Sequence, residues 1–144
     1  MTAVAFHFNV DDRLGYACRW LRKAVNQRAR VVVIGPPKIL QDLDVALWTL
    51  SETEFLPHCL SAASPDLVGR SPIVLANSVE AGMHGEVMLN LGDQVPAGFE
   101  QFERVTEVVT HDELERASAR QRWKHYQAGG CTIVRHDLAP QGAR

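Results

Sequence analysis

The chain has 144 residues, of which 46% are hydrophobic and 22% are charged, and its formal net charge is −2. This size and composition are typical of one globular domain with one core, and they exclude a disordered or coiled-coil protein. The small negative charge argues against a nucleic-acid footprint over the whole protein, although it is compatible with a local basic patch.

The N-terminal sequence MTAVAFHFNVDDR has no basic segment followed by a continuous apolar one, and no run approaches the roughly 20 apolar residues of a membrane span. We therefore expect a cytoplasmic protein with no membrane partner. Three cysteines, Cys18, Cys59 and Cys131, are odd in number and widely spaced. This spacing predicts buried apolar residues rather than disulfides or a metal motif.

The first third of the chain predicts a strand, a helix and a second strand. AVAFHF (3–8) alternates with period two, as in a half-buried strand. A helix follows, which Asp11 or Asp12 could cap. Its apolar residues at helical spacing are Leu14, Ala17, Cys18, Leu21 and Val25. The continuous run RVVVIG (30–35) indicates a strand that is buried on both faces.

The remaining elements alternate in the same way. We predict helices over 38–49 and 112–127, the second closed by Gly129 and Gly130. The predicted strands are SPIVLAN (71–77), EVMLNLG (86–92), FERVTEVVT (102–110) and CTIVRHDL (131–138). This order indicates one Rossmann-like α/β domain over 1–138, with a largely parallel central sheet flanked by helices, followed by a loose tail over 139–144.

The sequence lacks the usual signals of an enzyme of this fold. The first strand-to-helix turn reads FNVDDRLG and has no G-x-G-x-x-G or G-x-x-x-x-G-K-[ST] motif, so a small nucleotide-binding enzyme of doubly wound fold is the weaker alternative. The six histidines are scattered without metal-ligand spacing. We expect no catalytic residue, no metal and no cofactor.

The helix DELERASARQRWKHYQ is unusually basic and carries Arg116, Arg120, Arg122 and Lys124. Arg116 and Arg120 are one turn apart, and Trp123 lies about one turn beyond Arg120. Such a ridge suits an anionic peptide end that bears an aromatic side chain. Two alternatives remain: a solvated face balanced by neighbouring acidic residues, and direct binding of single-stranded DNA by interleaved aromatic and basic residues.

A second unusual stretch, LDVALWTLSETEFLPHCL (43–60), starts as an amphipathic helix and ends in a segment too irregular to be helical. Trp48 lies at the edge of the apolar stripe, and Phe55, Pro57 and His58 follow the polar SETE. Exposed aromatic residues on a rigid loop are typical binding anchors. The same residues could instead close the end of the core.

Together, in this order, the two stretches resemble the chi subunit family of bacterial DNA polymerase III. LDVALWTLSETEFLPHCL is similar to that family's LD-x-x-LW…F-x-PH segment, and ARQRWKHY (119–126) to its AR-x-R-[YW]-x-x-Y helix. The similarity extends from AFHF through RVVVI to the final strand. This chain has Arg116 and Trp123 where better-known members have Lys and Tyr, and its loop SAASPDLVGRS (61–71) matches the family only in being variable.

The resemblance implies a non-catalytic adaptor in the DNA polymerase III holoenzyme. One surface would hold the acidic, Phe-terminated tail of single-stranded DNA-binding protein, and another would hold the psi subunit, which links chi to the clamp loader. Carried over by position, the tail site comprises Arg116, Arg120, Trp123 and Val109. The psi site comprises Phe55, Trp48, Pro57 and His58. Nucleic acid would then be contacted only indirectly.

Overall fold

In the computed structural model, the residues described are 2–49, 57–61, 63, 68, 71–80 and 83–138. They form one seven-stranded sheet in the order β3-β4-β2-β5-β6-β1-β7, and every strand pair is parallel. The strands are β1 (Ala3–Val10), β2 (Val31–Ile34), β3 (His58–Leu60), β4 (Ile73–Ala76), β5 (Val87–Asn90), β6 (Arg104–Thr110) and β7 (Thr132–Asp137). The predicted α/β fold is confirmed, and the sheet is entirely rather than largely parallel across these strands.

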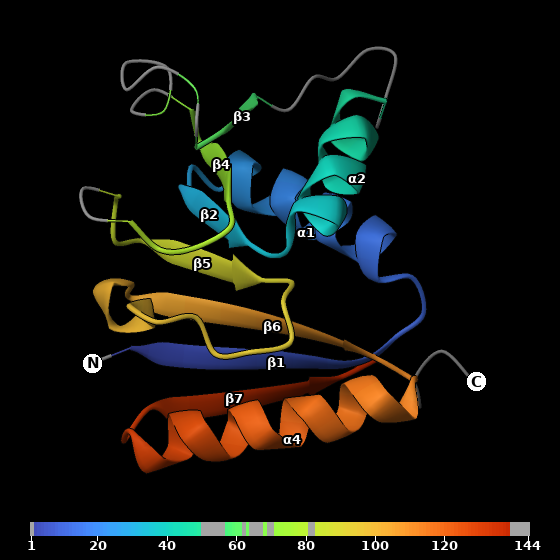
Figure 1. Cartoon of the computed structure of the whole chain (residues 1–144), viewed down its shortest axis with the longest axis vertical. Coiled ribbons are helices and arrows are strands. Elements are labelled where there is room, and N and C mark those ends of the chain that lie inside the picture. The colour runs from blue at the N-terminus through green and yellow to red at the C-terminus, as the bar shows by residue number, and fades with distance from the viewer. Residues whose placement is uncertain are drawn as a thin grey trace.

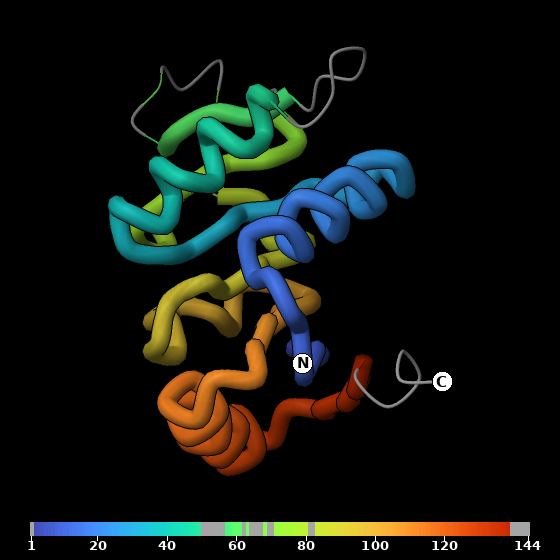
Figure 2. Tube along the Cα trace, turned by 90° about the vertical axis from the view of Figure 1, so that its right-hand side faces the viewer, coloured from blue at the N-terminus to red at the C-terminus, as the bar shows by residue number. Residues whose placement is uncertain are grey.

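The helices of the described residues are α1 (Arg13–Asn26), α2 (Pro37–Trp48) and α4 (Glu113–Ala128), with a short 3-10 helix η1 (Phe99–Gln101). Figure 1 shows α4 beside β7 at one end of the sheet, and α1 and α2 towards the other end. Figure 2, the view from the side, shows the bend of the chain from α1 into β2 and the separation of α4 from α1 and α2. None of these helices is both long and apolar enough to cross a bilayer.

The core has two halves, one on each face of the sheet, and β2 contributes to both. Val31 and Val33 pack with the apolar residues of α1 and α2, whereas Val32 and Ile34 pack with the cluster that contains Ala119 of α4. All residues of β2 are buried, as the uninterrupted β-branched run predicts. Helices α1 and α2 therefore cover one face, and α4 with η1 covers part of the other.

A buried polar network attaches α4 to the sheet. The Glu107 carboxylate on β6 accepts hydrogen bonds from Arg122 Nε at 3.0 Å, Asn90 Nδ2 at 2.9 Å and Tyr126 Oη at 2.6 Å. Glu107 is fully buried and Arg122 is 5% exposed. Burial raises the pKa of Glu107, against the opposing effects of Arg122 and the hydrogen bonds. Of the four basic residues named along this helix, Arg122 is therefore turned to the core and belongs to the attachment of α4.

Both predicted boundaries of α4 are confirmed by capping contacts. The Asp112 carboxylate accepts a hydrogen bond from the Glu115 amide. At the other end, the Gly130 and Cys131 amides donate to Gln127 and Tyr126 carbonyls, and Gly130 has φ 81°, which is a Schellman motif. At the start of α1, Asp12 occupies the N-cap position, but its side chain accepts no capping hydrogen bond.

Three further expectations need correction or stay open. His58–Leu60 forms the edge strand β3, where the sequence predicts only irregular chain. Cys18 and Cys59 are buried as predicted, but Cys131 is only half-buried. The loose tail 139–144, and most of the loop 61–71, lie outside the described residues.

We predict that Arg122→Leu destabilises the protein by about 3–5 kcal/mol at neutral pH, because it leaves the Glu107 carboxylate buried without its cation. The pKa of Glu107 should then rise further above its unfolded value. The folded state will hold a proton that the unfolded chain releases, so stability should increase as the pH falls. Urea denaturation at mildly alkaline and mildly acidic pH measures both effects.

The control is the double variant Arg122→Leu/Glu107→Gln, which removes the buried charge together with its partner. It should recover much of the lost stability and lose the added pH dependence. If Arg122→Leu alone has wild-type stability, or if its stability rises with pH, the role given to this ion pair is contradicted.

Candidate functional site

The first candidate surface lies on α4, on the side that turns away from the Glu107 network. Arg120 is exposed, and Arg116 and Trp123 are each partly buried. The spacing of the three residues places them on one side of the helix, as predicted. Among the described residues, neither guanidinium has an acidic partner within salt-bridge distance. Both can therefore donate hydrogen bonds to the carboxylate of a ligand.

Trp123 is held in place by aromatic side chains of β1. Its ring centroid lies 5.0 Å from that of Phe6 and 6.2 Å from that of Phe8. Phe6 is fully buried and Phe8 is partly exposed. The indole is therefore anchored on its inner side while part of its surface faces solvent. A fixed aromatic side chain loses little conformational entropy when it binds a ligand.

Val109, expected as part of an apolar wall, is fully buried on β6. It packs in the same core cluster as Ala119 and Trp123. Its side chain presents no surface to a ligand in this structure. Any part that Val109 has in the site is therefore to support Trp123 and α4 from beneath.

Two residues near this surface, Phe8 beside Trp123 and Arg135 over Phe8, were not predicted from the sequence. The Arg135 guanidinium on β7 lies over the Phe8 ring, 4.6 Å from its centroid. The Arg135 side chain is 57% exposed, and its nearest carboxylate, that of Asp137, is 3.8 Å away. These contacts add a third cation and a second aromatic ring to the α4 surface. Only the pairing of β1 with β7 brings them there, so spacing in the sequence gives no signal for them.

The second candidate surface joins the end of α2 to β3. The Trp48 side chain is 59% exposed, and its ring makes an edge contact with His58 at 5.4 Å between centroids. His58 Nε2 lies 2.9 Å from the Asp44 carboxylate, and the His58 side chain is only 1% exposed. Trp48 is therefore at the rim rather than in the core, and His58 supports it from below.

Further apolar residues enlarge this second surface. Val45, one turn before Trp48, is 58% exposed, and Leu60 of β3 is 48% exposed. Pro57 is also exposed, whereas Phe55 lies outside the described residues. Exposed apolar side chains that cluster on one face are typical of a protein-docking patch. Leu60 was not predicted because the strand that positions it was not recognised.

The β1–α1 turn does not resemble a phosphate-binding loop. The Asp11 carboxylate lies 2.9 Å from His111 Nε2, and Asp12 is the N-cap residue of α1. Two carboxylates therefore lie where such folds place glycine N–H groups for a phosphate. Within the described ranges, no three His, Cys, Asp or Glu side chains are grouped closely enough to hold a metal ion.

These observations define an all-parallel α/β domain with two candidate surfaces, one basic and aromatic on α4 and one apolar between α2 and β3. Residues 1–134 match the family model described as "DNA polymerase III chi subunit, HolC", so the chain belongs to this family. A relative, DNA polymerase III subunit chi of Pseudomonas aeruginosa, is 28% identical over 143 residues, which cover 96% of this chain and 98% of the relative. The family resemblance found in the sequence is thereby confirmed.

The contrast between Trp48 and His58 leads to a stability prediction. His58→Ala should destabilise the protein by about 1–3 kcal/mol, because it removes a buried ring and leaves Asp44 without this contact. Trp48→Ala removes a mostly exposed ring and should cost less than about 1 kcal/mol. Thermal or urea unfolding of the two variants, compared with wild type, tests this order. A reversed order would show that Trp48 is part of the core.

Proposed function

We propose that the protein is a non-catalytic accessory subunit of the DNA polymerase III holoenzyme in DNA replication, acting in the cytoplasm. In this role it binds the C-terminal tail of single-stranded DNA-binding protein and, through the psi subunit, connects that tail to the clamp loader. Membership of the chi family supports its place as a subunit of DNA polymerase III. The observation that carries the adaptor role is the exposed Arg120 beside the anchored Trp123.

The chemistry of the α4 surface matches that of an acidic tail that ends in Phe. Guanidinium groups bind carboxylates through two parallel hydrogen bonds, so Arg116 and Arg120 suit the terminal carboxylate and the acidic residues before it. The outer face of Trp123 offers an apolar surface for the terminal ring. Arg135 can contribute to the field that attracts the tail, because it lies over the neighbouring Phe8.

The α2–β3 surface has the opposite character, which supports a different kind of partner. Trp48, Val45 and Leu60 are exposed and apolar. Pro57 and the neighbouring Phe55 belong to the same segment of sequence. A patch of this type suits the apolar face of a partner segment rather than an acidic tail. We therefore assign the psi subunit to this surface.

For the tail site, we predict that Arg120→Ala weakens binding of an acidic peptide ending in Phe by roughly ten- to a hundred-fold, or about 1.5–3 kcal/mol. Arg120→Lys should retain more affinity than Arg120→Ala but less than wild type, because an ammonium group cannot form the two parallel hydrogen bonds of a guanidinium. Amidating the terminal carboxylate should reproduce the loss, and added salt should weaken the wild-type complex. Isothermal calorimetry with the free-acid and amidated peptides measures these effects.

The matched control is Arg19→Ala, which removes one exposed arginine from α1, outside the α4 surface. It should leave peptide affinity within about twofold of wild type. Equal affinity for the two peptides, or an unaffected Arg120→Ala variant, would show that the tail is held elsewhere.

For the psi site, we predict that Phe55→Ala and Trp48→Ala each weaken binding to the psi subunit of the same organism. For an anchor residue, the loss of binding free energy is about 2 kcal/mol or more, enough to reduce co-purification of the two proteins. Peptide binding at α4 should be unchanged in both variants. If Phe55→Ala unfolds the protein while the psi contact survives, Phe55 belongs to the core and the assignment fails.

A further inference from the structure

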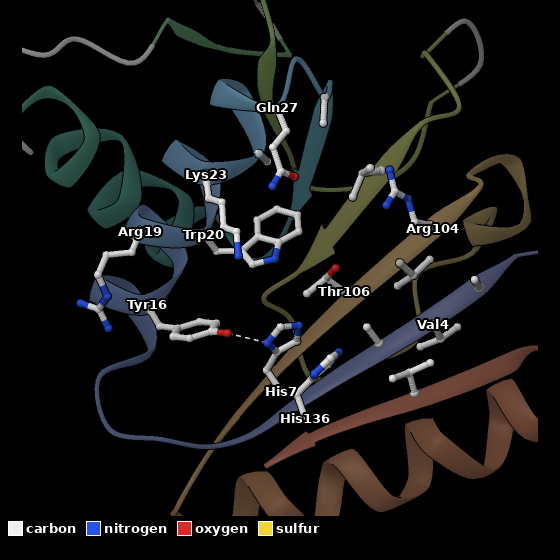
Figure 3. Close-up of a pocket in the computed structure, with 17 residues that line it drawn as sticks. Val4, His7, Tyr16, Arg19, Trp20, Lys23, Gln27, Arg104, Thr106 and His136 are labelled. Atoms are coloured by element: carbon white, nitrogen blue, oxygen red, sulfur yellow. Dashed lines mark hydrogen bonds between the residues drawn. The ribbon is translucent and has the colours of Figure 1, made fainter. Parts of the chain in front are cut away.

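A groove separate from both surfaces lies between α1 and the end of the sheet formed by β6, β1 and β7. It has a volume of about 520 Å³, within the usual range for ligand sites. Figure 3 shows Trp20 and Lys23 reaching from α1 over the sheet, with Arg104 at one end and the His7–Tyr16 pair at the other. Parallel sheets are normally covered on both faces, so this open strip of sheet is unusual.

The floor of the groove is small and apolar. Ala3 is exposed, Ala5 is half-buried, and Val134 of β7 is 48% exposed. The bulky residues of β1, such as Phe6, lie on the opposite face of the sheet, in the cluster with α4. A flat ring can therefore lie against the small residues of this floor, between Arg104 at one end and His7 and His136 at the other.

The charge of the groove is one-sided. Arg19, Lys23 and Arg104 are exposed and line it, and none of its lining residues is acidic. Within the described part of the chain, none of the three has a carboxylate at salt-bridge distance. In a protein with a net charge of −2, a groove whose charged lining residues are all basic favours an anionic ligand.

The cations are distributed along the groove rather than gathered at one point. Arg104 pairs in register with Ala3 at one end of the groove. At the other end, the Arg19 guanidinium lies over the Tyr16 ring, 5.9 Å from its centroid, and the Tyr16 hydroxyl contacts His7, four residues further along β1. At roughly 3.3 Å per residue, the two ends are about 13 Å apart. One compact anion cannot contact both ends, whereas a ligand with repeated negative charges can.

Aromatic and imidazole rings line the same groove. Tyr16 and Trp20 are one turn apart on α1, and the His7 and His136 rings lie 4.7 Å apart. Tyr16 Oη lies 2.5 Å from His7 Nδ1. Burial lowers the pKa of His7 to about 4 and raises the pKa of Tyr16, so both are uncharged at neutral pH. The pair can therefore donate and accept hydrogen bonds at the edge of a heterocyclic base.

We propose that this groove binds single-stranded nucleic acid, with bases stacked on Trp20 and its aromatic neighbours and phosphates contacted by Lys23, Arg104 and Arg19. Spaced cations next to flat rings are the combination by which proteins hold single strands without sequence preference. An acidic peptide that ends in a single Phe needs one ring surface, as at Trp123, whereas several rings line this groove along its length. The sequence suggests direct binding of single-stranded DNA only as an alternative for α4, so this groove is a different location for such a contact, and it does not depend on the adaptor role.

The test is fluorescence anisotropy of a labelled oligothymidylate with the full-length chain at low salt. The Lys23→Ala/Arg104→Ala variant should bind at least about tenfold more weakly. Its plot of log affinity against log salt should be shallower by about 1.4, because each phosphate contact on a single strand contributes about 0.7 to that slope. Trp20→Leu should also weaken binding several-fold, with folding of each variant checked by thermal unfolding.

Three comparison arms decide between this proposal and its rivals. The Arg120→Ala/Lys124→Ala variant of α4 has the same change in charge and should bind the oligonucleotide like wild type. Loss of binding in that variant but not in the groove variant would overturn the proposal. So would an acidic peptide that binds the groove more tightly than the oligonucleotide, or thymidine monophosphate that competes as well as the strand. An absence of oligonucleotide binding by the wild-type chain would also overturn it.

Discussion

The buried contact between Glu107 and Arg122 fixes how α4 lies on the sheet, and the features of that helix follow from it. With Arg122 and Tyr126 bound to the same carboxylate, the helix cannot rotate about its axis without leaving a buried charge unpaired. Rotation fixed in this way turns Arg120 to solvent and sets Trp123 on Phe6 and Phe8. The same short motif, ARQRWKHY, therefore specifies both the attachment of the helix and the surface it presents.

The second motif combines the same two roles. Leu43 and Leu47 are fully buried, and the Asp44–His58 contact joins α2 to β3. Trp48 then projects from the end of α2 with its ring against His58. Surfaces built in this way are preorganised, because the residues beneath them are held by the core. The two surfaces lie on different elements, as the proposed adaptor role requires.

Most of the fold could be predicted because each element has a strong local signal. The run VVVI, the apolar stripe of α1 and the Asp112 and Gly130 caps of α4 are each readable from neighbouring residues. The features that were missed depend on contacts between distant residues. In the sequence, Glu107 has no feature that distinguishes it from other strand residues, because its partner Arg122 is 15 residues away. Arg135 lies near the α4 surface only because β7 pairs with β1. The three-residue strand β3 has too few residues to show periodicity.

The most direct test of the adaptor role is a nuclear magnetic resonance titration of the labelled chain with an acidic peptide that ends in Phe. The largest shifts should fall on the amides and side chains of Arg116 to Trp123, and on Phe8 beside them, with the Trp48 indole unaffected. Shifts concentrated instead on Trp20 and β1, or no shifts at peptide concentrations that saturate a micromolar site, would contradict the assignment of the tail to α4.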